Sequence, residues 1–423
     1  MKAKIYPLEH TIKDIEATAS PFCLHLQIIC ASLAKGTSTI KNLIDSNDVD
    51  TTIEWCRSIG AVIKKVNDKL VIKGVDNIIN YKSSLFVCNT SITAKLMIPL
   101  LCSVTQPFGV KSNKTIIKEL SAYKKILESF GVSFFLENEM IRFEKILNPI
   151  EVEIDGDVDI YFVAGLLIAL PLLKGHSVLK LRAPIRSEKN YSTILKILKQ
   201  FRVDIKHPAT MRYEINGYQS YRATSIKTEI DNLLLSFNSL LTQRLNTDEK
   251  IMLLNYQSNS TQEDSTLFEF IKKNVINYSN YFLKRSIKKK NINFHKLDSN
   301  VENSLPLLMV LCVLNNQDSI ITRLNFSKER VKKQYSIMAK AFSKLKLDFS
   351  AFDSEIVIQP CKIKEKKQIE SENDPYVVMA LAYLALLSDY PIVIRNADCI
   401  YNINKDFYNM LSRYGANIEF IYD

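Results

Sequence analysis

The spacing of apolar residues along this chain predicts two kinds of helix. In the first kind, apolar residues recur every three or four positions beside lysine and glutamate, as in AYKKILESFG at residues 122–131. This spacing predicts an amphipathic helix with one face toward a core. The second kind is apolar nearly all round, as in FVAGLLIALPLL at residues 162–173. Such a helix is predicted to be buried inside a domain, because it has no polar face to present to water.

Both kinds of helix recur at a fixed period. Each amphipathic helix ends at a break before a strand, and the six breaks are Gly60, Gly131, Arg202, Asn274, Lys346 and Gly415. The successive spacings are 71, 71, 72, 72 and 69 residues. A nearly constant period over the whole chain indicates six copies of one structural repeat. At the glycine breaks we expect the left-handed residue that ends many helices.

Each repeat is predicted to run strand, buried helix, strand, outer helix, strand, strand. A repeat of ~70 residues is too short to enclose two layers of helix by itself. A solenoid is one alternative, but solenoid repeats are usually shorter. We therefore expect an α/β fold of two domains, each built from three βαβαββ repeats. Because the chain begins with a strand-like piece, residues 1–19 are expected to join residues 241–423, and residues 20–240 to form the other domain.

Composition narrows the class of partner. The formal charge of +11 and the pI of about 9.0 favour anionic partners, either phosphorylated small molecules or nucleic acid. Eight scattered cysteines without a CxxC pair argue for a reducing compartment and against a disulfide framework. Five isolated histidines do not build a metal centre. We therefore expect no metal centre.

The sequence predicts no membrane segment. The N-terminal stretch MKAKIYPLEHTIKDIEA lacks the apolar core of a signal peptide. The longest apolar stretch, residues 162–173, is too short to span a bilayer. We expect a cytoplasmic protein that does not bind membranes.

Six repeats in two halves, together with AKGTSTIKNLIDSNDVDTTIEWCRSIGAVI at residues 34–63, resemble the enolpyruvyl transferases, and among them the EPSP synthase (3-phosphoshikimate 1-carboxyvinyltransferase) family most. Weaker support comes from VEIDGDVDIYF, NSTQED and SKERVKK. The resemblance implies two inverse α/β domains joined by two crossovers, with the active site in the cleft between them. It also implies transfer of the enolpyruvyl group of phosphoenolpyruvate to shikimate 3-phosphate, a step of aromatic amino acid biosynthesis, by a monomer that needs no cofactor.

The resemblance assigns substrate-binding positions, and several of them depart from the family pattern. Where the family has Gly-Ser-Lys-Ser, this sequence has ASPF at residues 19–22, and Leu26 stands at an arginine position. Lys95 replaces another arginine, and Asp159 replaces a serine that would bind the phosphate of the acceptor. Tyr376 stands where the family has a further arginine. The predicted substrate-binding residues are Ser20, Asn89, Lys95, Lys114, Ser187, Lys332 and Asp374.

Two of these residues have a second interpretation. Ser20, followed by Pro21, is also a favourable helix cap. Lys114 belongs to the lysine-rich segment VKSNKTIIKEL at residues 110–120, which is equally typical of a solvated surface. A lysine holds a phosphate as a point charge, but without the two-pronged geometry of arginine.

The reaction needs a proton donor for the methylene group of phosphoenolpyruvate and a base for the attacking hydroxyl. By resemblance, Glu329 is the donor, with Lys328 and Lys332 side by side on one helical face. An ordinary charged helix face is the alternative, because KExxK is a weak motif. Asn303 stands at the position of the family's aspartate base, and an amide does not accept a proton at neutral pH.

Four functions are compatible with these residues. The chain carries out the family's step through altered contacts, transfers to a different acceptor, serves as a non-catalytic binding module, or binds nucleic acid. The last is disfavoured because no stacking aromatics alternate with arginine. The number of missing charges favours an EPSP synthase-like protein whose activity is lost or strongly altered. The expected partners, if binding is retained, are phosphoenolpyruvate and shikimate 3-phosphate or a related acceptor.

Overall fold

The chain folds into two compact units, each with its own hydrophobic core. Unit 1 comprises Met1–Thr18 and Ile230–Asp423, and unit 2 comprises Ala19–Glu229. The computed structural model describes residues 1–10, 12–75, 84–104, 106–183, 188–246, 248–279, 281–285, 304–315, 318–322, 324, 326, 329–352, 355–359, 362–363 and 365–422.

The second boundary lies between Glu229 and Ile230, not after residue 240 as the sequence predicted. The reason is the helix α8 (Asn232–Ser239), whose residues are all buried. Its apolar side chains belong to the core of unit 1, so the chain has to enter that unit before the helix begins. A boundary drawn after the helix assigns its apolar side chains to the wrong core.

The described residues of unit 2 form three helices that are buried along almost their whole length and three four-stranded sheets. The buried helices are α1 (Pro21–Leu33), α3 (Ser91–Leu101) and α6 (Ile160–Ala169), and the outer ones are α2 (Asn47–Ser58), α4 (Lys114–Ser121), α5 (Lys124–Ser129) and α7 (Glu188–Gln200). The sheet orders are β14-β3-β5-β4, β6-β7-β9-β8 and β10-β11-β13-β12. The strands are β3 (Thr37–Lys41), β4 (Val62–Val66), β5 (Lys69–Lys73), β6 (Leu85–Val87), β7 (Phe108–Lys111), β8 (Ser133–Glu137), β9 (Met140–Glu144), β10 (Glu151–Asp155), β11 (His176–Arg182), β12 (Lys206–Ala209), β13 (Arg212–Asn216) and β14 (Ser225–Lys227).

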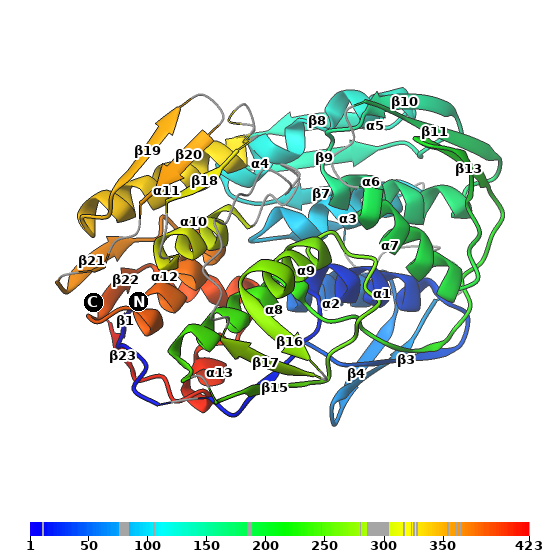
Figure 1. The fold of residues 1–423 in the computed structure, drawn as a ribbon. Coiled ribbons are helices and arrows are strands. Elements are labelled where there is room, and N and C mark those ends of the chain that lie inside the picture. Colours follow the sequence, from blue (N-terminus) through cyan, green and yellow to red (C-terminus); the bar gives the residue numbers. More distant parts are fainter. Residues whose placement is uncertain are drawn as a thin grey trace. The chain divides into compact units, whose positions relative to one another are not determined.

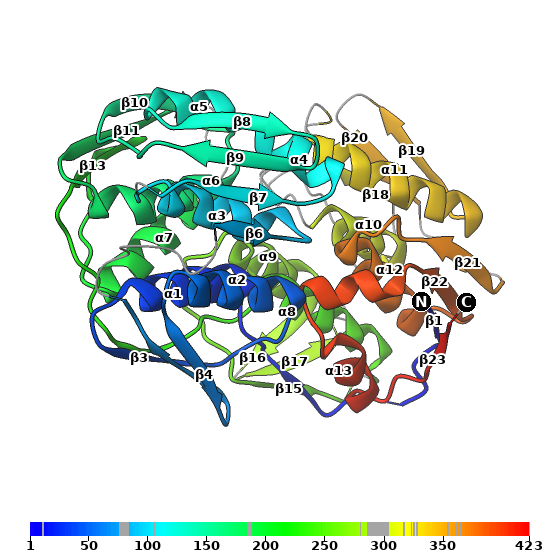
Figure 2. The same cartoon turned by 180° about the vertical axis from the view of Figure 1, so that it is seen from behind.

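Unit 1 repeats this plan (Figures 1 and 2). Its buried helices are α8, α10 (Leu305–Leu314) and α12 (Pro375–Leu387), and its outer ones are α9 (Ser265–Asn274), α11 (Glu329–Lys344) and α13 (Phe407–Arg413). The described sheets have the orders β16-β17-β15-β2, β18-β20-β19 and β21-β22-β1-β23. The strands are β1 (Lys2–Ile5), β2 (Asp14–Glu16), β15 (Ile251–Leu254), β16 (Ile276–Ser279), β17 (Phe282–Arg285), β18 (Ser319–Ile321), β19 (Phe349–Phe352), β20 (Glu355–Ile358), β21 (Lys367–Glu370), β22 (Ile392–Arg395) and β23 (Ile418–Ile421).

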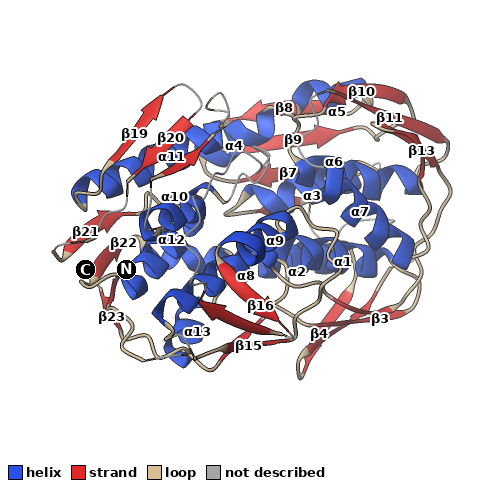
Figure 3. Ribbon diagram, viewed as in Figure 1, coloured by secondary structure: helices blue, strands red, loops and turns tan. Residues whose placement is uncertain are grey.

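The predicted fold class is confirmed in this arrangement. Within a repeat such as β6-α3-β7-α4-α5-β8-β9, the first two strands pair in parallel and the last two join the sheet antiparallel. In each unit the sheets lie outside the buried helices (Figure 3). A helix with no polar face is thereby covered on all sides, as its sequence requires.

At each of the two crossovers between the units, the last strand before the crossing pairs within the unit that the chain is leaving. Strand β2 precedes α1 of unit 2 but pairs with β15 of unit 1, and β14 precedes α8 of unit 1 but pairs with β3 of unit 2. The crossing segments also bond to each other: the amide of Ser20 donates to the carbonyl of Glu229, and the amide of Asp231 to that of Thr18, both at 2.8 Å. Strand β1 lies between β22 and β23, which ties the N-terminal residues to the C-terminal half.

Five of the six predicted breaks end their helix in the same way. The residue at the break has positive φ at Gly60, Gly131 and Gly415, as expected, and also at Arg202 and Lys346. Each donates its amide to the carbonyl three residues earlier, and the next residue donates to the carbonyl five residues earlier. This pair of bonds is the Schellman motif. The exception is Asn274, where β16 begins two residues after the helix ends.

We predict that Arg202→Gly stabilises the protein. Arg202 is exposed and has φ 65°, a left-handed conformation that costs a non-glycine residue about 1 kcal/mol. Glycine adopts it without that cost, so the free energy of unfolding in a urea titration should rise by a similar amount. The matched control is Arg202→Ala, which removes the same side chain but keeps a Cβ and should not stabilise. Equal stabilisation by both variants would contradict the explanation.

Candidate functional site

Ser20 lies at the N-terminus of the first buried helix and is itself buried, with 3% of its surface exposed. Its hydroxyl accepts a hydrogen bond from the amide of Cys23 at 3.4 Å, and Pro21 occupies the first turn of α1. The helix-cap interpretation of Ser20 is therefore confirmed. A role in binding a ligand stays a prediction.

Lys95, in the second turn of α3, is nearly fully buried and already bound to acids of its own unit. Its ammonium group lies 2.9 Å from Oδ2 of Asp159 and in a short contact with Glu119 of α4. Burial alone would lower the pKa of Lys95, but the negative charges of Asp159 and Glu119 outweigh burial and raise it. The sequence placed Lys95 and Asp159 separately, as one weakened cation and one opposing anion, and the structure brings them together.

The other two predicted residues of unit 2 that the structure describes are exposed. Asn89 lies in the turn between β6 and α3, and Lys114 is the first residue of α4. The side chain of Asn113 caps α4 by accepting a hydrogen bond from the amide of Ile116 at 3.0 Å. Ser187 lies outside the described residues. The exposure of Lys114 fits either of its two interpretations.

A buried polar cluster that the sequence did not reveal lies among α1, α2 and α3. Nδ1 of His25 bonds to the hydroxyl of Thr52 at 2.7 Å, and that hydroxyl bonds to the hydroxyl of Thr93 at 2.6 Å. Among the described residues, Nε2 of His25 and Oδ1 of Asp48 are buried and have no hydrogen-bond partner. Burial lowers the pKa of His25 to about 4 and raises that of Asp48 to about 7. Both side chains therefore favour the neutral form inside the protein.

In unit 1 the predicted proton donor lies at the start of an outer helix. Glu329 is the first residue of α11, Lys332 follows one turn later, and both side chains are exposed. The neighbouring predicted residues Lys328 and Asn303 lie outside the described residues. The catalytic assignment of Glu329 stays a prediction.

Asp374 caps the buried helix α12. One carboxylate oxygen accepts hydrogen bonds from the amides of Tyr376 at 2.9 Å and Val377 at 3.1 Å, and the other accepts one from Gln334 of α11 at 3.4 Å. The guanidinium of Arg330, on α11, lies 5.5 Å from the centre of the Tyr376 ring. The first turns of α11 and α12 therefore lie together.

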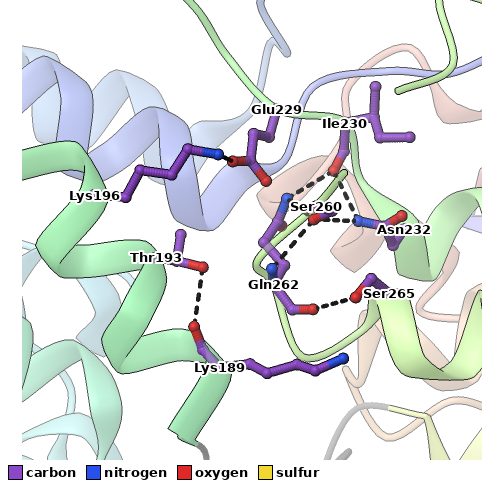
Figure 4. Close-up of polar contacts among 9 residues, drawn as sticks. All are labelled: Lys189, Thr193, Lys196, Glu229, Ile230, Asn232, Ser260, Gln262 and Ser265. Atoms are coloured by element: carbon purple, nitrogen blue, oxygen red, sulfur yellow. Dashed lines mark hydrogen bonds and ion pairs between the residues drawn. The ribbon is translucent and has the colours of Figure 1, made fainter. Parts of the chain in front are cut away.

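A second polar network surrounds the N-terminus of α8 (Figure 4). The Gln262 side chain donates to the carbonyl of Ile230 at 3.0 Å, and the Asn232 side chain donates to the hydroxyl of Ser260 at 3.1 Å. Burial, and to a smaller extent the negative charge of the nearby Asp231, raise the pKa of Asp264 to about 7. Asp231 itself caps α8 by accepting from the amide of Leu234 at 2.9 Å.

Sequence reasoning missed Asp231 and Asp264 as well as His25 and Asp48. Each aspartate stands at or just inside the start of a helix, which is the one local signal that the sequence offered. The burial of His25 and Asp48, the partial burial of Asp231 and Asp264, and the proximity within each pair come from the tertiary fold, which that signal does not encode.

Within the described residues, no group of three His, Cys, Asp or Glu side chains is arranged to hold a metal ion. In the same residues, every helix is too short or too polar to cross a bilayer.

The chain is similar to one family along almost its full length. It matches the family model described as EPSP synthase (3-phosphoshikimate 1-carboxyvinyltransferase) over residues 6–411. It is 28% identical over 405 residues to a 3-phosphoshikimate 1-carboxyvinyltransferase of Clostridium perfringens strain SM101, covering 92% of each chain. It is 26% identical over 443 aligned positions to that of Clostridioides difficile strain 630, covering 98% of each.

Two kinds of solved structure share the fold. EPSP synthase from Acinetobacter baumannii superimposes with a TM-score of 0.78 at 16% identity, covering 99% of this chain and 100% of that one. The enolpyruvyl transferase NikO from Streptomyces tendae superimposes with a TM-score of 0.75 at 13% identity, covering 99% and 98%. At such identities these likenesses establish the fold.

We predict that Asp48→Asn stabilises the protein increasingly as pH rises from 4 to 7. The folded protein holds the Asp48 proton up to about pH 7, whereas the unfolded chain releases it near its ordinary value of 3.8. The wild type therefore loses stability through this window, by up to a few kcal/mol, at about 1.4 kcal/mol per pKa unit. Stability that the neutral His25 contributes, which is lost as pH falls from 6.5 toward 4, is common to both proteins and cancels in the difference.

The measurement is the free energy of unfolding of variant and wild type at pH 4, 5.5 and 7. Asp50→Asn is the matched control, because Asp50 lies in the same first turn of α2 but is exposed. A difference between Asp48→Asn and wild type that does not change with pH would show that Asp48 titrates normally.

Proposed function

Because this chain belongs to the EPSP synthase (3-phosphoshikimate 1-carboxyvinyltransferase) family, we propose that it is a divergent member whose enolpyruvyl transfer to shikimate 3-phosphate is lost or strongly reduced. The observation that carries the proposal is that uncharged residues stand at three positions where the resemblance expects cations. Leu26 is buried in the core of unit 2, with 1% of its surface exposed. Pro21 forms the first turn of α1, and Tyr376 packs against the core of unit 1.

These replacements remove donors for anionic groups of the substrates. A hydrogen bond to a charged group is typically worth about 1.5–3 kcal/mol. Three lost contacts therefore weaken binding of the substrates or the transition state by about a thousandfold or more, since each 1.4 kcal/mol is a factor of ten. Asn303 in place of the aspartate base removes proton acceptance as well. Weaker substrate binding and the missing base both lower the rate of enolpyruvyl transfer.

Transfer to a different acceptor is the second candidate. It is favoured by the carboxylate of Asp159, which stands where the resemblance expects a serine for the acceptor phosphate. The family's carboxylate at Glu329 is retained and exposed at the start of α11. A chain that kept this proton donor but changed its acceptor site would still consume phosphoenolpyruvate. A non-catalytic binding module is the third candidate.

The cysteines support a reducing compartment, and we infer the cytoplasm. The seven cysteines in the described part of the chain are all buried, and none of them forms a disulfide bond. Burial raises the pKa of Cys56 to about 12 and of Cys88 to about 11, so their reactive thiolate forms are scarce at neutral pH. Such thiols behave as small apolar side chains. We expect the protein to act as a monomer without a nucleic-acid partner.

The first test is phosphate release from phosphoenolpyruvate with shikimate 3-phosphate. We predict a kcat/KM at least about a thousandfold below that of the Clostridium perfringens relative assayed in parallel, from the lost contacts above. A rate within tenfold of the relative would mean that other residues supply the missing charges, and the proposal would be wrong.

The second test concerns Glu329. In any phosphate release that depends on phosphoenolpyruvate, Glu329→Gln should lower kcat by about a hundredfold or more, because positioned proton donors contribute that much. Glu355→Gln is the control, since Glu355 is an exposed carboxylate on β20 of the same unit. If the two variants lose activity equally or not at all, Glu329 belongs to an ordinary charged helix face.

A further inference from the structure

The outer face of the sheet β14-β3-β5-β4 in unit 2 carries lysines on all four of its strands. Side chains alternate along these strands between a buried inner face and an outer face. Ile40, Leu70, Ile72 and Ile226 point inward, and the inner face packs on α1 and α2 (Figure 2). The outer face, here called the lysine face, carries five exposed lysines: Lys41 of β3, Lys64 of β4, Lys69 and Lys73 of β5, and Lys227 of β14.

The strand register places three of these lysines in one row. Lys41 lies opposite Lys69 on one side and opposite Lys227 on the other. Their ammonium groups start from neighbouring strands, which are only about 4.8 Å apart in a sheet. Like charges on directly opposed residues destabilise a sheet. The row therefore lowers the stability of the protein unless a negative charge neutralises it.

No carboxylate of the described residues supplies that negative charge. None of the five lysines forms an ion pair with another residue of the described part of the chain. Lys65, which follows Lys64 but points to the other side of β4, does pair with Asp45 at 2.9 Å. The hairpin of β4 and β5 contains one acid, Asp68, which lies in its turn.

Another sheet of the same unit shows that such a face need not be left positive. In β10-β11-β13-β12, two cations again lie opposite each other, Lys180 of β11 and Arg212 of β13. Glu151 of β10 binds both of them, in a short contact with Lys180 and at 3.9 Å from Arg212. Exposure to solvent alone therefore does not explain why the lysine face has no such acid. Charge complementarity points to a partner that brings the anions.

We propose that the lysine face binds an acidic segment of another protein, through the carboxylates of that segment. Val62 and Val66, each 49% exposed, lie between the lysines and offer apolar contact to a polypeptide. A phosphodiester backbone has no apolar group that would use this contact. The outward positions of the four strands include no arginine and no aromatic residue, the types that hold phosphates in a two-pronged way and stack on bases.

The dimensions of the lysine face fit a segment better than a folded domain. Four strands of up to five residues cover roughly 250 Å², from a strand spacing of about 4.8 Å and a rise of about 3.3 Å per residue. A stable interface between folded proteins buries about 800 Å² on each partner. Membrane-binding surfaces insert Trp, Phe or Leu, and the outward positions of these strands carry none of them. The inference does not depend on the proposed function, because it concerns a different surface of unit 2.

The test is calorimetric titration of the full chain with poly-L-glutamate at low salt. The variant combines Lys41→Gln, Lys69→Gln and Lys227→Gln. We expect it to bind at least about tenfold more weakly than the wild type, because an exposed ion pair contributes up to about fivefold. The variant should fold, and its free energy of unfolding should rise, because the like charges in the row are gone.

The matched control combines Lys125→Gln, Lys199→Gln and Lys206→Gln. These three lysines are exposed in unit 2 but lie outside the sheet β14-β3-β5-β4, so the control has the same net charge as the variant. It should weaken binding by less than about threefold, as expected for distant charges. Equal weakening by both sets of substitutions, or no binding of poly-L-glutamate to the wild type, would overturn the proposal.

Two further probes test the other classes of anionic partner. They are an oligothymidylate with the same number of charges and vesicles that contain phosphatidylserine. We expect both to bind more weakly than poly-L-glutamate does. If either bound about tenfold more tightly, and the substitutions in the lysine face abolished that binding, the partner would be a nucleic acid or a membrane and the proposal would be wrong.

Discussion

The structure depends on the burial, in every repeat, of one helix that has no polar face. A single repeat is too small to cover such a helix, so three repeats share a core and their sheets close it from outside. The same constraint explains why β2 and β14 pair within the unit that the chain is leaving, because a strand can stay with one core while the helix that follows it enters the other. It also brings α3 and α6 together at Gly165, and this contact places Lys95 beside Asp159.

Periodicity was enough to predict the repeat, the fold class and the buried helices, because these follow from local apolar spacing. It was not enough at Arg202 and Lys346, which adopt positive φ although neither residue type favours it; the period of the repeat was the only sign. The predicted boundary after residue 240 was wrong because the apolar sequence of α8 does not show which of the two cores the helix joins. The pairing of Lys95 with Asp159 links residues 64 positions apart, and no local pattern encodes it. Two departures from one family pattern, the lysine at 95 in place of an arginine and the aspartate at 159 in place of a serine, were the available hint.

Whether this chain can bind an anion depends on which cations and helix N-termini are not already bound by groups of the protein itself. In an anion-binding site, cations and helix N-termini are left for the ligand. In unit 2 the N-terminus of α1 is capped by Ser20, that of α6 by Asp159, and Lys95 is bound by two acids. In unit 1 Asp374 caps α12 in the same manner. The fold of the family is thus preserved, while the helix N-termini and the lysine that could attract an anion are already bound by side chains of the protein itself.

The most direct test of this internal binding is the coupling between Lys95 and Asp159 in a double-mutant cycle. Lys95→Met, Asp159→Asn and the double variant are compared with the wild type by the free energy of unfolding at pH 7. We predict a favourable coupling of about 1–3 kcal/mol, as expected for a partly buried pair in direct contact. A coupling indistinguishable from zero would mean that the ammonium group is not held by this carboxylate. Lys95 would then remain open to an external anion, and the closure of this helix end by internal groups would be contradicted.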